Sequence, residues 1–142
     1  MAPIQFPSGS GTLDVTVQDN NGAPSSVLEA NMAFTIDAEW SIDQYSAATL
    51  SGTWELSAYV ESIGAGPEQQ VGPTEPVQLD GRFAPNKYQA TITVPAGTLP
   101  DNPDPATASG VYKLATVLVL RGPFNQITDV VAFVEGPLLR IG

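Results

Sequence analysis

Two long apolar segments near the C-terminus, 109–120 and 127–141, constrain the fold of this chain most strongly. Both are rich in Val, Leu and Ile, and β-branched residues are typical of strands. The residues between them include Gly122 and Pro123, which favour a turn. The sequence therefore predicts a long antiparallel hairpin at the centre of an all-β domain.

Shorter strands are predicted upstream, because apolar and polar residues alternate there with a period of two. The expected strands are 12–18, 31–43 (with Met32 and Trp40 on its apolar side), 53–63, 77–84 (with a short-hairpin signal at Asp80-Gly81) and 88–94. Residues rich in Gly, Pro, Asn and Asp predict a turn at 19–22, a loop at 64–76 and a crossing loop at 95–108. No helical periodicity is visible. We therefore expect one domain at 12–142, a two-sheet Greek-key sandwich of about seven strands, after an extended or flexible segment at 1–11.

The composition limits the chemistry that this chain can perform. Its 142 residues suffice for one hydrophobic core, but they include no Cys and no His, which removes thiol nucleophiles, His-based triads and the usual zinc ligands. A net charge of −10, from 15 acidic and 5 basic residues, argues against nucleic acid or an anionic membrane surface as partner. Residues 1–11 do not resemble a signal peptide, and the apolar runs are too short to span a bilayer, so the compartment stays open.

Several segments resemble an immunoglobulin-type domain. The run Ser-Gly-Val-Tyr-Lys-Leu at 109–114 resembles the start of strand F, usually Asp-Ser-Ala-Val-Tyr-Tyr-Cys, and residues 133–141 resemble strand G, Phe-Gly-x-Gly-Thr-x-Leu-x-Ile, without its first Gly. The resemblance covers roughly 31–141 and implies a cysteine-free immunoglobulin-like sandwich of no specific family. It implies that Tyr112 is a tyrosine corner bonded to the preceding loop and that Trp54 packs across the core. Ala38 and Leu114 would replace the two cysteines.

The predicted hairpin is apolar on both of its faces, although only one face can meet the second sheet. If 109–114 follows the strand F pattern, Tyr112 and Leu114 point inward and the opposite face is exposed. An exposed apolar face usually marks an interface, so we expect this chain to bind a second copy of itself or another protein. The predicted interface residues are Val117, Val119, Val131, Phe133 and Tyr59. Two alternatives are that residues 1–11 or 64–76 cover this face, or that its composition reflects only the β-propensity of central strands.

Enzymatic function is not expected. Paired carboxylates could drive glycoside hydrolysis, and Glu55 with Glu61, or Asp37 with Glu39, share one strand face. A flat, wet sheet face neither raises a carboxyl pKa nor excludes water, so these residues suit solvent exposure better. Lys113 could form an internal isopeptide crosslink, but a lysine on a wet face explains it equally well.

A ligand-binding module that uses its end loops is the alternative function. Calcium prefers clustered carboxylate and carbonyl oxygens, which 19–22 and 101–104 could offer, although turns favour Asp and Asn in any case. Trp40, Tyr45 and Tyr59 could form an aromatic platform for a glycan, although the alternation of 31–43 favours a core position for Trp40. We expect no cofactor.

Overall fold

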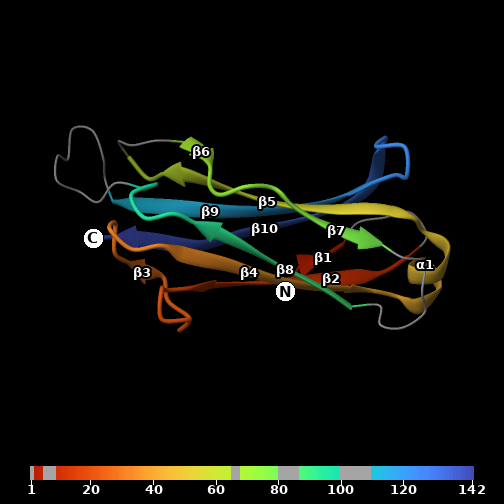
Figure 1. Cartoon of the computed structure of the whole chain (residues 1–142), viewed down its shortest axis with the longest axis horizontal. Helices are drawn as coiled ribbons and strands as arrows, with labels where there is room; N and C mark the ends of the chain where they lie inside the picture. The colour runs from red at the N-terminus through yellow and green to blue at the C-terminus, as the bar shows by residue number, and fades with distance from the viewer. Residues whose placement is uncertain (1, 5–8, 65–67, 80–86, 100–109) are drawn as a thin grey trace.

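The computed structural model describes residues 2–4, 9–64, 68–79, 87–99 and 110–142, and its strands form two β-sheets packed face to face (Figure 1). Sheet A has the strand order β1 (Ala2–Pro3), β2 (Gly11–Gln18), β4 (Phe34–Ile42), β8 (Lys87–Val94). Sheet B has the order β3 (Val27–Leu28), β10 (Ile127–Ile141), β9 (Val111–Arg121), β5 (Gly52–Ser62), β6 (Glu68–Gln70), and β7 (Glu75–Leu79) also pairs with β5. The predicted all-β two-sheet sandwich is confirmed, and seven of its strands are five residues or longer.

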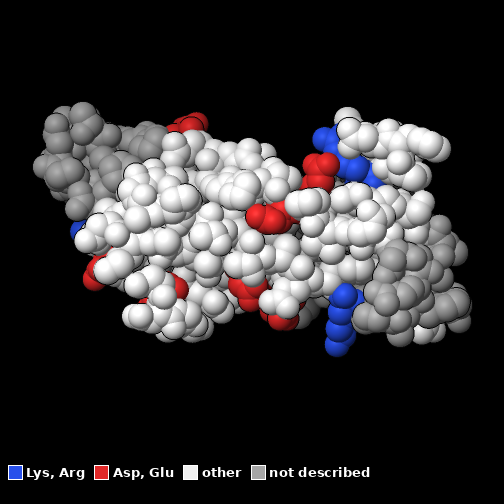
Figure 2. Space-filling model, in the orientation of Figure 1, with Lys and Arg blue, Asp and Glu red and all other residues white. Residues whose placement is uncertain are grey.

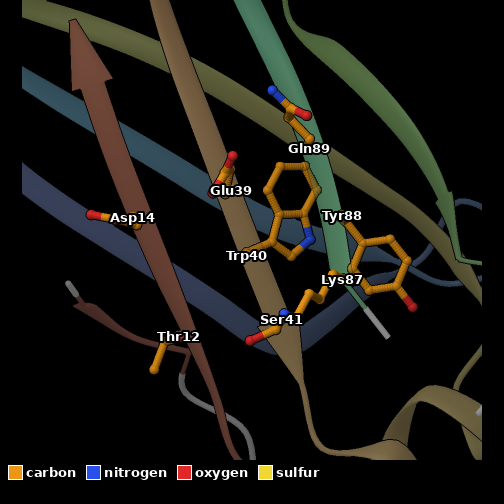
Figure 3. A pocket seen from close by; sticks show the side chains of 8 residues that line it. All are labelled: Thr12, Asp14, Glu39, Trp40, Ser41, Lys87, Tyr88 and Gln89. Atoms are coloured by element: carbon orange, nitrogen blue, oxygen red, sulfur yellow. The ribbon is translucent and has the colours of Figure 1, made fainter. Parts of the chain in front are cut away.

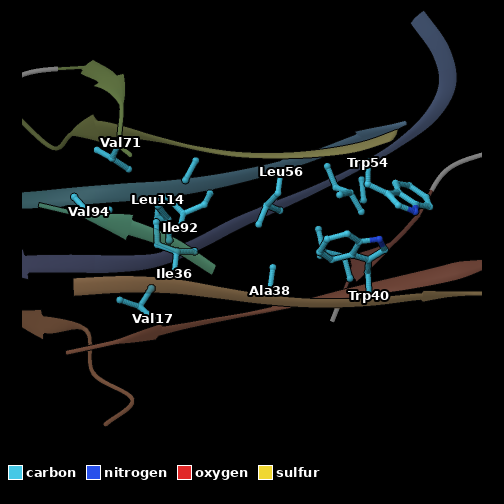
Figure 4. Close-up of a cluster of buried hydrophobic side chains, with 14 of the residues drawn as sticks. Val17, Ile36, Ala38, Trp40, Trp54, Leu56, Val71, Ile92, Val94 and Leu114 are labelled. Carbon is cyan, nitrogen blue, oxygen red and sulfur yellow. The ribbon is translucent and has the colours of Figure 1, made fainter. Parts of the chain in front are cut away.

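The core lies between the sheets and follows the alternation of the strands (Figure 4). The four residues predicted as core markers, Ala38, Trp54, Tyr112 and Leu114, are all fully buried. Trp54 of sheet B meets Trp40 of sheet A edge to face, with ring centroids 6.0 Å apart. The two indoles therefore join the sheets at one end of the core, which agrees with the position expected for Trp54.

The β9–β10 hairpin forms as predicted and lies inside sheet B. Its turn is closed by the Gly122 amide, which donates to the Gln126 carbonyl at 2.9 Å, and Asn125 takes the positive φ of 62°. The pairing register shifts twice along β10, between Ile127 and Val131 and between Glu135 and Leu138. These bulges change which side chains of β10 face outward.

One segment departs from the predicted loops. The expected loop at 64–76 contains β6 and the start of β7, because both pair with β5. β7 joins β5 in sheet B, and β8 joins β4 in sheet A. The short-hairpin signal at Asp80-Gly81 lies within 80–86, outside the described residues.

A single turn of helix, α1 (Gln44–Thr49), connects β4 to β5 and was not predicted, since it is too short to show a periodicity. Asp43 caps it: its carboxylate accepts from the amides of Ser10 and Ser46 and from the Ser46 hydroxyl. These hydrogen bonds lower the pKa of the Asp43 carboxyl group to about 2, and the bond from the Ser10 amide makes the largest contribution. In the part of the chain that is described, no helix is long and apolar enough to cross a membrane.

Smaller differences occur near the first strands. Met32, expected on the core side, is 41% exposed because β4 begins only at Phe34. Within 1–11, Ala2 and Pro3 pair with β2 of sheet A, and Ile4 is buried in the core.

Candidate interaction surface

The outer face of sheet A is polar on its three long strands. Its outward side chains on β2, β4 and β8 are Thr12, Asp14, Thr16, Gln18, Thr35, Asp37, Glu39, Ser41, Lys87, Gln89, Thr91 and Thr93. Asp37 accepts hydrogen bonds from Thr91 Oγ1 at 2.8 Å and from Gln89 Nε2 at 3.2 Å. A shallow hollow of about 430 Å³ crosses this face, and Figure 3 shows the side chains that line it, among them Asp14, Glu39 and Gln89. This is the composition of a sheet face in contact with water.

The outer face of sheet B is apolar along the middle of β9 and β10, whereas β5 beside them carries Thr53, Glu55, Ser57 and Glu61 outward. Phe133 lies opposite Val117, and Val131 lies opposite Val119, on the paired strands β10 and β9. We call the following residues the apolar face: Tyr59, Ala115, Val117, Val119, Val131, Phe133 and Leu138. Phe133 is 52% exposed and Leu138 57% exposed. Large apolar side chains of β10 therefore stand in contact with solvent, beside the half-buried valines of β9.

Ion pairs bound the apolar face at both ends. Arg121 Nε lies 3.6 Å from Glu55 Oε1 at one end, which is an ionic contact longer than a hydrogen bond. Lys113 Nζ lies 2.6 Å from Glu135 Oε1 at the other end. The Glu135 hydrogen bond and charge raise the pKa of Lys113, and the Glu61 charge adds to the rise. Lys113 and Arg121, the cations at the two ends of the apolar face, are thus already paired.

A hollow of about 490 Å³ opens where the apolar face meets β6. Its lining combines aromatic, small and charged side chains from four neighbouring strands. We call it the Ala115 hollow, and it is lined by Tyr59, Val60, Glu61, Glu68, Gln69, Gln70, Lys113, Ala115, Phe133 and Glu135. In the edge-on view of Figure 2, acidic side chains are spread over the sandwich, and basic ones are few.

All five residues predicted to form an interface lie on the outer face of sheet B, so the structure brings them together. Their function as an interface stays a prediction. The alternative covers do not reach this face within the described residues: β1 pairs with β2 in sheet A, and 68–76 extends sheet B beside β5. Tyr112 is buried as expected, but the loop to which it should bond lies outside the described residues.

Sequence reasoning missed Leu138 and the Ala115 hollow. Leu138 faces outward because the bulge at 136–137 shifts the alternation of β10. The Gly-Pro pair at 136–137 was the available signal for that bulge. The hollow depends on β6, which lies in a segment that the sequence predicts to be a loop. The sequence therefore contains no local signal that Glu68 lies beside Glu61.

The residues of the alternative functions are dispersed. Trp40 is 2% exposed, as expected for the core, whereas Tyr59 lies on the outer face of sheet B, so these two share no platform. The Tyr45 side chain lies outside the described residues.

Asp19 and Glu55, two of the carboxyl groups considered for calcium or catalysis, have ordinary partners. Asp19 Oδ1 accepts from the amides of Asn21 and Ala23 and so closes its own turn, while 101–104 lies outside the described residues. Over the described ranges, no three acidic side chains form a group suited to a metal ion. Glu55 pairs with Arg121, and Lys113, the candidate for an isopeptide bond, pairs with Glu135.

No protein-family model and no curated protein matches this sequence. Among solved structures, the chain is similar to part of a β-glucosidase from Listeria innocua, with a TM-score of 0.52 and 10% sequence identity. The glucose complex of that enzyme gives a TM-score of 0.54. Both matches cover 95% of this chain, which spans only 16% of the enzyme. The CARDB domain of a Pyrococcus furiosus protein, solved with di-metal ions, is matched at a TM-score of 0.49, with 10% identity and 96% of each chain covered. At this identity the β-glucosidase likeness describes the fold alone.

Proposed function

We propose that this chain is a non-enzymatic, immunoglobulin-like interaction domain that docks onto a protein surface through the apolar face of sheet B. The immunoglobulin-like assignment is supported by the strand order, in which β2, β4 and β8 form one sheet and β10, β9 and β5 the other. It is also supported by the short β3, which pairs in parallel with the last strand, and by Trp54 in the core.

One observation carries the docking proposal: β9 and β10 present adjacent apolar side chains outward, whereas the long strands of sheet A present polar ones. Sheet A shows that this chain can cover the outward side of three neighbouring strands with polar side chains. The β-propensity of a central strand does not explain the difference, because β4 is also central and carries Thr35, Asp37, Glu39 and Ser41 outward. Removing apolar area from water gains about 25 cal/mol per Å², so a partner that covers Phe133 and Val117 is favoured.

Site-specific photo-crosslinking in the native host tests this proposal. A photoreactive amino acid placed at Val117 on the apolar face is compared with one placed at Thr91 on the polar face of sheet A. We expect a discrete crosslinked species from position 117 alone, whose mass and identity give the partner. Equal or absent crosslinking at both positions would argue against docking through sheet B.

Light scattering after size exclusion, over a hundredfold range of concentration, distinguishes the two kinds of partner. A second copy would give a mass that rises with concentration and falls back to the monomer in Val117→Glu. A constant monomer mass combined with crosslinking from position 117 would assign the face to a different protein.

A further inference from the structure

The Ala115 hollow has the geometry of a slot for one side chain. Ala115 of β9 lies between its cross-strand partners Tyr59 of β5 and Glu135 of β10, and it supplies only a methyl group to the floor of the hollow. Phe133 also lines the hollow, one outward position further along β10 and opposite Val117. A small floor between a ring and a carboxylate leaves room for a long, slender side chain.

The charges around this slot favour a cation. Glu61, Glu68 and Glu135 line it against the single ammonium of Lys113, which leaves an excess of two negative charges. Lys113 is bonded to Glu135 at 2.6 Å and is also the cross-strand partner of Glu61, so one ammonium group serves two carboxylates. On its other side, Glu61 is the cross-strand partner of Glu68 in the β5–β6 pairing.

Like charges directly opposite each other on paired strands destabilise a sheet. Lys113 offsets the repulsion between Glu61 and Glu68 only from the far side of Glu61, and a cation bound between the two carboxylates would reduce it further. Aromatic rings also attract cations, and Tyr59 and Phe133 both line the hollow. The acidic and the aromatic residues of the hollow thus favour the same ligand chemistry.

We infer that the Ala115 hollow accepts a basic side chain, arginine or lysine, from the protein segment that docks on the apolar face. This inference rests on the proposed function and specifies its partner: an extended segment with a basic residue flanked by apolar ones. A second copy of this chain is disfavoured, because each chain carries a net charge of −10 and two copies repel each other.

Peptide titrations monitored by amide chemical shifts of the isotope-labelled chain provide the test. The probes are Ac-Leu-Ser-Arg-Ser-Val-NH2, whose Leu, Arg and Val share one side of an extended chain, and its two analogues in which Arg becomes Gln or Glu. We expect the Arg peptide to shift the amides of Tyr59, Ala115 and Phe133, and to bind about three- to tenfold more tightly than the Gln peptide. The Glu peptide should bind most weakly, and salt should reduce the preference for Arg.

A charge-matched pair of variants locates the preference. The double variant Glu61→Gln/Glu68→Gln removes two carboxylates from the hollow and should abolish the preference for Arg without loss of thermal stability. The control Asp14→Asn/Glu39→Gln removes two carboxylates from the outer face of sheet A and should retain the preference.

Three results would overturn the inference. The first is equal binding of the three peptides or no shift at the hollow, and the second is an equal effect of the two double variants. The third is concentration-dependent shifts of the same amides without peptide, which would identify a second copy as the occupant. The proposed function is judged separately: crosslinking from position 117 without any preference for Arg leaves it standing, whereas loss of both rejects both.

Discussion

Thr116 places an unpaired hydroxyl in the core, and its removal should stabilise the fold. Thr116 is fully buried on β9 between Ala58 of β5 and Val134 of β10. Its Oγ1 has no hydrogen-bond partner among the residues that the structure describes. A buried polar group without a partner costs about 1–3 kcal/mol. Thr116→Val keeps the branched shape, replaces the hydroxyl with a methyl group and should recover about 1–2 kcal/mol of that cost.

Urea unfolding measures this gain directly. The midpoint should rise while the dependence of the free energy on urea stays unchanged, since both proteins expose nearly the same surface on unfolding. For a chain of this length we expect Tm to rise by roughly 3–8 °C. Thr93→Val on the wet face of sheet A is the matched control and should change stability by less than about 0.5 kcal/mol. A destabilised Thr116→Val would refute the reasoning, because it would mean that the hydroxyl is hydrogen-bonded in solution.

Three further perturbations test other parts of the account. Leu118→Ala in the core should lower the free energy of unfolding by about 2–5 kcal/mol. Val117→Glu, on the opposite side of the same strand, should leave the melting temperature within a few degrees of wild type. Similar losses of stability in the two variants would mean that β9 is buried on both faces. Asp43→Asn should lower Tm at neutral pH, because the folded-state pKa is depressed from 3.8 to about 2 and the carboxylate stabilises the fold above the unfolded value. That difference should shrink as pH falls from about 4 to about 2, and a difference independent of pH would contradict the role of the carboxylate. Gly52→Ala should destabilise the fold by more than about 1 kcal/mol in chemical unfolding. The reason is that Gly52 has a φ of +133° and an added Cβ would collide with the Arg121 carbonyl oxygen. An unchanged unfolding midpoint would contradict that geometry.

Alternation was enough to predict the sandwich, because each long strand buries one side. In 34–42 the side chains alternate between core and solvent, and this pattern alone orients Trp40 inward. Alternation alone did not orient β9, because both of its sides are apolar. The resemblance of 109–114 to strand F predicted that Tyr112 and Leu114 point inward, and both are buried. Strands β3 and β6 were not predicted, because a strand of two or three residues shows no periodicity. The pairing of each also depends on neighbours distant in sequence.

The candidate site was predictable only in its apolar part. The apolar part consists of residues on the side of the hairpin that faces away from the core, and their apolar character is visible in the sequence: Val117, Val119, Val131 and Phe133. The acidic part depends on register: Glu61 meets Glu68 only because β6 pairs with β5. A single sequence carries no local signal for such long-range pairing.

The central claim is that the apolar face of sheet B is covered by a partner while the polar face of sheet A is not. Because the chain has no Cys, a single introduced thiol reports on one position without interference. Phe133→Cys and Thr91→Cys are each treated with a maleimide, once in the native lysate and once as purified dilute protein. We predict that the thiol at position 133 is protected in the lysate and reactive after purification, whereas the thiol at position 91 reacts in both. Equal reactivity of the two thiols in the lysate would contradict the account.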